Sequence, residues 1–398
     1  MLHSLRFGNF YSFKDEVEVS FVMDGRASVN DKSAPSGAQP SSRLSKILAV
    51  IGANGAGKTN VIKPFAFLSY FLTRSVNNDP EDPTYVENHF ADDENVTFFD
   101  LEFEIEKRLF RYSLNLDSDI VYSEMLWEKT SRQWSYVFMR TLDENLKTYK
   151  FQQKGFGFDS KLAKNSKRNC SIISYATQHD VKLARKISSY FKKFHTNINA
   201  SGRNPSKGLH ELMEGSAFYE KNEHYKNLMV NYLSRWDMGL SGVEIRHIKH
   251  LDDNGKEHDL TIPIGIHTID DKVYELPLMA ESSGTQSAFI LLSKMLPVLQ
   301  EGGVMVYDEL ESDLHPHMLE GILEFFFNPK TNPHAAQIIF TTHSVELLNI
   351  LQKCQIMLVE KQSCTSEAWK LSDMAGVRSD DNFYAKYMSG TYGAIPQI

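Results

Sequence analysis

One segment constrains the fold of this chain more than any other: residues Gly52–Thr59 read GANGAGKT and match the pattern G-x-x-x-x-G-K-[ST]. The glycines of this pattern let backbone N–H groups converge on phosphate oxygens, and the helix that follows adds its positive N-terminal end. A continuous apolar run at residues 46–51 precedes the segment, and a helix is predicted for residues 58–74. A strand buried on both faces, followed by such a turn and a helix, predicts an α/β fold with a parallel sheet.

The residue types in this segment predict a nucleoside triphosphate with magnesium as the ligand. Lys58 can reach the β- and γ-phosphates, and the Thr59 hydroxyl can bind Mg²⁺. The alternative is an ordinary glycine-rich turn between a strand and a helix. The residues expected to bind nucleotide here are Asn54, Gly55, Ala56, Gly57, Lys58 and Thr59.

Two acidic residues follow a second apolar strand, predicted at residues 303–307. A carboxylate at the C-terminal end of a parallel strand lies where ligands bind in α/β sheets. Asp308 could hold Mg²⁺, directly or through water, and Glu309 could polarise the attacking water as a general base. The alternative is that both acids are turn or cap residues, which commonly follow strands.

Two further segments have the chemistry of a phosphate site. Ser283 is predicted to cap a helix at residues 284–299, and Gly284 admits close backbone approach, so this helix start could bind a second anion. His343 follows an apolar strand at residues 337–341 and could contact a γ-phosphate. A plain capped helix and a structural histidine are the alternatives.

Elsewhere the chain alternates between strand-like and helix-like patterns. Residues 24–45 are rich in Ser, Gly, Ala and Pro and are predicted to form a mobile loop. Residues 161–236 contain apolar side chains three or four apart, which predicts amphipathic helices. The remaining predicted strands lie within residues 1–24, in a hairpin at 98–116 that turns at Lys107-Arg108, and at 121–127, 134–140, 243–246, 260–267 and 274–276.

Charge is distributed unevenly along the sequence. The net charge of -8 argues against non-specific coating of nucleic acid. Residues 150–195, however, contain eleven Lys and Arg against two acids, whereas residues 77–106 contain eleven acids and no Lys or Arg. The basic helices could contact DNA, RNA or an acidic partner. Alternatively, they form a solvated face or pair with the acidic segment of another subunit.

The cysteines and the hydropathy pattern indicate the cellular compartment of the protein. Cys170, Cys354 and Cys364 show no CxxC spacing, so neither a disulfide framework nor a zinc site is expected, and reduced thiols fit a cytoplasmic protein. No stretch approaches 18 uninterrupted apolar residues, and the N-terminus lacks the apolar core of a signal peptide. We therefore expect no membrane span.

Taken in order, these motifs resemble the ABC-type ATPase heads of the SMC/RecF class. In that resemblance Gly52–Thr59 is the phosphate loop, Asp308 and Glu309 end the Walker B strand, and His343 is the switch histidine. Ser282–Gln286 stands where the family has the signature motif LSGGQ, and Ser312–His315 is the D-loop. The opening Asn9–Phe13 resembles the family's NFxSF, and Asn60 after Gly-Lys-Thr is typical of nucleotide-binding positions in the class.

The chain departs from the family pattern in several places. Ser282 replaces the usual Leu of the signature and Thr285 its second Gly, which puts a side chain where backbone should approach phosphate. His315 replaces the usual D-loop Asp. The Q-loop glutamine stays open, with Gln152, Gln153 and Gln178 as candidates.

The segments 308–316, 340–344 and 387–396 are similar to a bacterial subgroup of compact ABC ATPases. That subgroup serves anti-phage and abortive-infection systems and includes AbiL-like proteins and the AriA subunit of the PARIS system. The resemblance implies an ABC ATPase head: an α/β P-loop NTPase with a mixed sheet flanked by helices, an antiparallel β subdomain and a helical insert. It implies lobe I at residues 1–155, a basic helical insert at 156–240 and lobe II at 241–398.

The resemblance also implies function and partners. Two heads would sandwich two ATP with Mg²⁺, with Ser283 and Gly284 of one head against ATP on the other, and Lys58, Glu309 and His343 as catalytic residues. The chain would be the ATPase subunit of an anti-phage defence system that senses a phage-encoded trigger and holds or releases a separate effector, for example a TOPRIM-type nuclease. About 55 residues follow His343, too few for a nuclease domain. The alternative is a RecF/SMC-like repair ATPase that binds DNA directly.

Overall fold

A six-stranded sheet forms the centre of the molecule, and it is parallel except at one edge. The computed structural model describes residues 1–23, 33–92, 95–143, 145, 147–200, 202–204, 208–236, 239–251, 257–312 and 314–396. The strand order is β11-β17-β18-β5-β19-β20, and β20 pairs antiparallel to β19. The bounds are β5 (Ile47–Gly52), β11 (Phe194–Thr196), β17 (Val304–Tyr307), β18 (Gln337–Thr342), β19 (Ile356–Gln362) and β20 (Thr365–Lys370).

Every residue of β5 is buried, because the central sheet is covered on both faces. Leu48 and Val50 point into one hydrophobic core, shared with α1 (Lys58–Arg74) and the antiparallel sheet. Ile47, Ala49 and Ile51 point into the second core, under α7 and α8. Alternation along a strand therefore places apolar side chains on both faces, as the continuous apolar run predicts.

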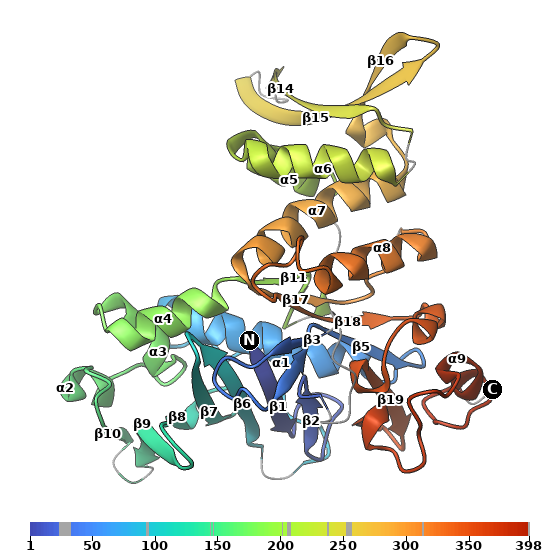
Figure 1. Ribbon diagram of the computed structural model, residues 1–398. Coiled ribbons are helices and arrows are strands. Elements are labelled where there is room, and N and C mark those ends of the chain that lie inside the picture. The colour runs from blue at the N-terminus through green and yellow to red at the C-terminus, as the bar shows by residue number, and fades with distance from the viewer. Residues whose placement is uncertain are drawn as a thin grey trace.

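A seven-stranded antiparallel sheet packs against the other side of α1 (Figure 1). Its hairpin turns at Glu106 and Lys107, whose φ angles are 51° and 64°, one residue earlier than predicted. Its order is β10-β9-β8-β7-β6-β1-β2, and β10 was not predicted from the sequence. The bounds are β1 (Leu2–Gly8), β2 (Val17–Ser20), β6 (Thr97–Ile105), β7 (Arg108–Leu116), β8 (Val121–Lys129), β9 (Trp134–Asp143) and β10 (Thr148–Gln153).

The other helices form two groups (Figure 1). The first lies beside α1 and the antiparallel sheet, and the second is stacked above the central sheet, below the three-stranded sheet β14–β16. The first group is α2 (Ser160–Lys164), α3 (Ile172–Gln178) and α4 (Lys182–Phe191). The second group and its sheet are α5 (Leu209–Lys221), α6 (Glu223–Arg235), α7 (Ser283–Glu301), α8 (Pro316–Phe327), β14 (Gly242–Leu251), β15 (Glu257–Ile269) and β16 (Lys272–Pro277). The short helix α9 (Phe383–Met388) lies near the C-terminus.

The fold is the mixed α/β P-loop architecture that the motifs predict, with two local corrections. Part of the predicted loop is a hairpin, β3 (Ser33–Pro35) with β4 (Arg43–Ser45), whereas residues 24–32 lie outside the described residues. The stretch predicted as helices also contains β11, which joins the central sheet, and a small hairpin of β12 (Ile198–Asn199) and β13 (Gly202–Arg203). Sequence periodicity missed them because each strand has only two or three residues. The division at residues 155 and 240 stays a prediction.

The basic and acidic segments meet within one chain. Lys186 pairs with Glu106, and Arg168 lies 3.6 Å from a carboxylate oxygen of Glu81. The Lys167 ammonium donates to the backbone oxygens of Val76 and Asn78, at 3.1 and 2.7 Å. Some of the basic side chains of residues 150–195 are therefore paired with other groups of the same chain.

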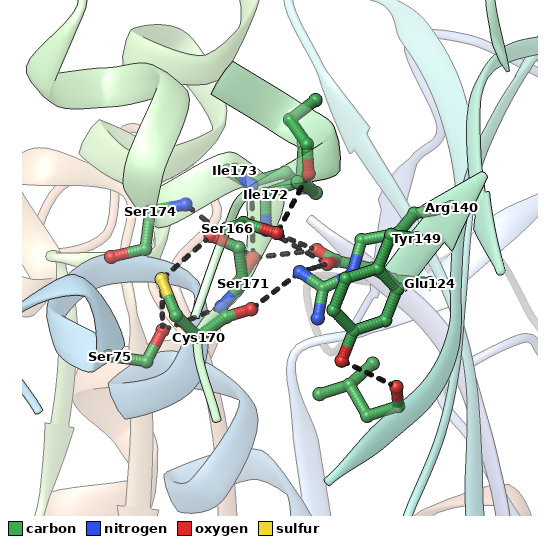
Figure 2. Close-up of polar contacts among 12 residues, drawn as sticks. Ser75, Glu124, Arg140, Tyr149, Ser166, Cys170, Ser171, Ile172, Ile173 and Ser174 are labelled. Atoms are coloured by element: carbon green, nitrogen blue, oxygen red, sulfur yellow. Dashed lines mark hydrogen bonds and ion pairs between the residues drawn. The ribbon is translucent and has the colours of Figure 1, made fainter. Parts of the chain in front are cut away.

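A buried ion pair joins the antiparallel sheet to α3 (Figure 2). Glu124 on β8 and Arg140 on β9 are both fully buried, with 3.4 Å between Oε2 and Nη1. Glu124 also accepts from the Ser171 hydroxyl at 2.7 Å and the Ile172 N–H at 2.8 Å, at the N-terminus of α3. Arg140 donates to the backbone oxygen of Cys170 at 2.8 Å. These bonds fix the sheet to the helix, because Glu124 and Nη1 of Arg140 find their partners at the start of α3.

Neutralising one partner of this pair is expected to destabilise the protein strongly. Glu124→Gln leaves the buried Arg140 charge uncompensated, and we expect a loss of about 3–5 kcal/mol in the free energy of unfolding. Glu128→Gln is the control on the same strand, because Glu128 pairs with Arg108 at the surface and the expected loss is about 1 kcal/mol or less. Urea unfolding of both variants measures the difference, and equal losses would contradict the role of the buried pair.

His195, on β11, gives the fold a pH dependence in mild acid. Burial, with a smaller effect of Lys294, lowers the pKa of His195 from 6.5 to about 4. The folded state therefore resists protonation that the unfolded chain accepts, so stability is complete above pH 6.5 and falls as the pH drops toward 4. We expect His195 to account for a loss of up to about 3 kcal/mol, measured by urea unfolding across this range. His195→Gln should lack this part of the pH dependence, and an unchanged slope in that variant would refute it.

Among the described residues, no helix combines the length and apolar character needed to cross a membrane. Cys170 and Cys354 are buried and Cys364 is exposed, and all three are free thiols.

Candidate nucleotide site

The phosphate loop has a conformation that its glycines make possible. Gly55 and Gly57 adopt φ angles of 74° and 107°, in the region that side chains disfavour. A Cβ on Gly57 would lie 2.5 Å from the Ser366 hydroxyl and 2.9 Å from the Ser12 hydroxyl. Gly57 therefore permits both the left-handed turn and the close approach of Ser12 and of Ser366 on β20, and α1 begins at the next residue.

Lys58 is held beneath this turn by backbone oxygens. Its ammonium donates to the carbonyl oxygens of Gly52 and Ala53, at 3.0 and 3.1 Å. Burial lowers the pKa of Lys58, and the nearby carboxylates of Asp308 and Glu309 oppose that shift. None of these contacts is a direct ion pair, so the ammonium can neutralise an anion bound in the turn.

Asp308 lies against the start of α1, although the two are far apart in sequence. The Thr59 hydroxyl donates to its carboxylate oxygens at 3.0 and 3.1 Å, and the Thr341 hydroxyl donates to Oδ1 at 2.6 Å. The Asn197 side chain fixes the backbone of Asp308 through two hydrogen bonds of 2.7 and 2.9 Å. A hydroxyl and a carboxylate this close are the hard oxygen ligands that Mg²⁺ prefers, so Thr59 and Asp308 fit the magnesium site that the motifs imply.

Glu309 adopts a left-handed backbone, with φ at 50°. Such a conformation costs a non-glycine residue on the order of 1–3 kcal/mol and persists where the surroundings impose it. Here its N–H donates to the Thr341 hydroxyl at 2.7 Å. The half-exposed carboxylate pairs with Arg203 and lies 3.8 Å from Nε2 of His343. The backbone of His343 is in turn held by Glu311, which accepts its N–H at 2.6 Å.

The predicted residues of the phosphate loop, the Walker B strand and the switch position therefore meet in one cavity of about 720 Å³. Ala56 lies beside it and lines the adjoining cavity, which also contacts Asn54, Gly55 and His343. Asn60 donates to the Ser12 hydroxyl at 2.9 Å. The lining residues of the first cavity are Asn54, Gly55, Gly57, Lys58, Thr59, Asn60, Asp308, Glu309, Thr341 and His343.

Ser283 and Gly284 are not brought to this cavity. They begin α7, which runs in Figure 1 from beside the three-stranded sheet down toward the central sheet. The N-cap is Ser282 rather than Ser283, because the Ser282 hydroxyl accepts the Thr285 N–H at 3.2 Å. The Thr285 side chain is buried and bonded to Ser282 at 2.9 Å, whereas Ser282 and Ser283 are exposed at this helix start.

The predicted D-loop is described only in part, and no candidate for the Q-loop glutamine lines the nucleotide cavity. Asp313 lies outside the described residues, and His315 caps α8 by accepting the His317 N–H at 3.3 Å. Gln152 and Gln153 lie on β10 and Gln178 ends α3, and none of the three lines the nucleotide cavity described above.

Asn197, Arg203 and Thr341 are site residues that the sequence did not lead us to predict. Asn197 lies just after β11 and holds the backbone of Asp308, whereas Arg203 lies on β13 and pairs with Glu309. No motif or periodicity marks either residue. A signal was available for Thr341, since it precedes His343 at the end of an apolar strand.

Comparison with known proteins gives one extended sequence match. The family model described as "AAA domain, putative AbiEii toxin, Type IV TA system" matches residues 47–349. Among curated proteins, none matches the chain.

Solved structures resemble the chain weakly. An SmcHead bound to the C-winged helix domain of ScpA is 12% identical with a TM-score of 0.42, over 92% of this chain and 96% of that one. An Smc head domain with an extended coiled coil, bound to the C-terminal domain of ScpA, from Pyrococcus furiosus is 11% identical with a TM-score of 0.41, over 93% and 96%. An Smc head domain with a coiled coil and joint from Pyrococcus yayanosii is 9% identical with a TM-score of 0.42, over 98% and 99%.

Proposed function

The chain belongs to this AbiEii-type AAA domain family, and from that premise we propose that it is an ABC-type ATPase that binds and hydrolyses ATP with Mg²⁺. The observation that carries the proposal is the contact between Thr59 at the start of α1 and Asp308 at the end of β17. It joins the phosphate-binding turn to a carboxylate with 248 residues between them in the sequence. A glycine-rich turn without a ligand would not require such a pairing.

The proposed roles follow from position and charge. The turn at Gly55–Lys58 presents backbone N–H groups and the Lys58 ammonium to the phosphates. Thr59 and Asp308 would hold Mg²⁺, which when bound would supply positive charge to the phosphates. Glu309 orients the attacking water and accepts its proton. His343 lies close enough to Glu309 to contact the same reacting region, at 3.8 Å from its carboxylate.

The second half of the proposed site comes from another copy of the chain. Ser283 is exposed and lies outside the lining of the nucleotide cavity described above. Its helix has 19 residues and is about 28 Å long, with its C-terminal end leading into β17. We therefore place Ser283 and Gly284 against ATP bound to a partner head, in a head-to-head homodimer with two ATP.

Within this ATPase class, the family description, which names a putative AbiEii toxin and a type IV TA system, supports a role in anti-phage defence. We propose that ATP-driven head association holds or releases a separate effector, as in AbiL-like and PARIS ATPases, in the cytoplasm. The RecF-like alternative needs a free basic surface for DNA. It is supported less well, because Lys167 donates to backbone oxygens of Val76 and Asn78, and Arg168 and Lys186 pair with acids of the same chain.

Copurification from the native host separates these two functions. A tagged chain is isolated with nuclease treatment, with and without ATP, and assayed for Mg²⁺-dependent ATP hydrolysis, bound proteins and duplex DNA binding. The defence proposal predicts hydrolysis that chelation of Mg²⁺ removes, and a stable protein partner that survives nuclease. Hydrolysis with ATP-dependent duplex binding and a steep salt dependence would favour the repair function instead. Absence of hydrolysis would contradict both.

A further inference from the structure

A second cavity of about 520 Å³ lies along α1, beyond the nucleotide site. It follows the face of the helix that includes Lys63, Tyr70 and Arg74, and it is closed by the Phe10–Tyr11 turn and by the residues around β11 and β12. None of the described residues that line the nucleotide cavity lines this one. Its volume is in the range of small-molecule sites.

The charged groups of this cavity are all positive. Lys63, Arg74 and Lys192 line it, and no Asp or Glu does so among the described residues. An enclosure with three cations and no acid attracts an anion.

Lys63 is the buried member of this set. It is 8% exposed, and within the described part of the chain its ammonium makes no hydrogen bond or ion pair with a side chain or backbone oxygen. The ammonium lies over the Tyr11 ring, 3.6 Å from the ring centre. Burial lowers the pKa of Lys63, with opposing effects from Glu87 and Asp308, which lie outside the cavity lining. A buried ammonium without an anionic partner is a ready phosphate contact.

Aromatic rings form much of the remaining wall. Tyr11, Phe67, Tyr70, Tyr85 and Phe194 line the cavity, and Tyr85 at the rim is 44% exposed. Such rings offer flat surfaces on which nucleobases stack, whatever the base. Hydroxyl and amide groups of Ser69, Thr196 and Asn199 lie between them.

We propose that this cavity binds a nucleotide unit, with its phosphate at Lys63 and its base against the aromatic wall. The unit is either a free nucleotide or part of a single strand. The site is separate from the ATP site but shares two elements with it. Helix α1 carries both Thr59 and Lys63, and the β12–β13 hairpin lines the cavity at Ile198 and Asn199 and places Arg203 on Glu309. A ligand here therefore acts on the elements that hold the ATP site.

The test measures nucleotide binding after the phosphate loop has been disabled. In the Lys58→Ala background, equilibrium dialysis measures binding of adenosine, guanosine, cytidine and uridine 5′-monophosphates and of a short single-stranded oligothymidylate. We expect one site per chain for at least one of these probes. Lys63→Met should weaken that binding about tenfold or more, because it removes a charged phosphate contact. Lys63→Arg should restore it.

Two further variants distinguish the loss of this binding site from a general loss of positive charge or of folding. Ala66→Phe fills the cavity without changing its charge and should also weaken binding. Lys161→Met removes an exposed lysine on α2 outside the cavity and should leave binding unchanged. Thermal unfolding checks that each variant is folded. Binding by the monophosphates identifies a free nucleotide, and binding by the oligothymidylate alone identifies a strand.

Either of two results would overturn the proposal. The first is that no probe binds the folded Lys58→Ala protein. The second is that binding persists undiminished in both Lys63→Met and Ala66→Phe. Neither result bears on the ATPase proposal, because that proposal is tested on the protein with Lys58 intact.

Discussion

Lys58→Ala is expected to lower ATP hydrolysis at least about a hundredfold and to remove measurable ATP binding at micromolar concentrations. The ammonium is the buried cation beneath the phosphate turn, held by the carbonyl oxygens of Gly52 and Ala53. Removing one preorganised electrostatic group from such a site costs on the order of 10²–10³ in rate. Titration calorimetry with ATP and Mg²⁺, together with a steady-state phosphate-release assay, measures both effects.

The matched control for this variant is Lys46→Ala. Lys46 is also a buried lysine, immediately before β5, and its ammonium donates to the backbone oxygen of Phe327 at 3.0 Å, outside the nucleotide cavity. We expect this variant to lose stability but to keep ATP binding. If Lys58→Ala bound and hydrolysed ATP as the unaltered protein does, the phosphate loop would not be the site.

Glu309→Gln is expected to lower hydrolysis by about 10²–10⁴ while ATP binding persists. The carboxylate is the proton acceptor of the proposed site, and general bases typically contribute factors of this size. Gln keeps the shape of the side chain, so the left-handed backbone and its bond to Thr341 should remain. Single-turnover measurement of bound ATP separates the hydrolysis step from binding.

Glu346→Gln serves as the control, since it alters an exposed carboxylate shortly after the switch histidine. We expect its hydrolysis rate to match that of the unaltered chain. A Glu309→Gln protein that retained full turnover would remove Glu309 from the mechanism and leave Asp308 as the only proposed acidic participant.

Local spacing in the sequence was enough to predict the core of the fold and most of the residues that line the nucleotide cavity. The strand β5, the turn and helix α1 follow each other directly, so the periodicity and glycines of residues 46–74 define them. Asp308 could be placed because parallel strands end at one edge of a sheet. Asp308 contacts Thr59 because both residues lie at that edge of the sheet, however far apart they are in the sequence.

The features that were missed depend on tertiary contacts. β11 is three residues long and pairs with β17 at the edge of the central sheet, so it is too short to show a periodicity of its own. Asn197, directly after β11, reaches the backbone of Asp308, and Arg203 reaches Glu309 from the β12–β13 hairpin that follows. Likewise, the hairpin β3–β4 lies in a Ser- and Pro-rich stretch whose composition favours a loop. The register of such short strands is set by their partners.

Association of the heads is the most direct test of the central claim, that ATP lies between the phosphate loop of one copy and Ser283 of another. Light scattering of Glu309→Gln protein should give the monomer mass without nucleotide and twice that mass with ATP and Mg²⁺. Adding Ser283→Arg, which places a bulky side chain at the exposed start of α7, should restore the monomer although ATP still binds. A mass that ignores ATP, or a dimer that forms equally well with Ser283→Arg, would contradict the account.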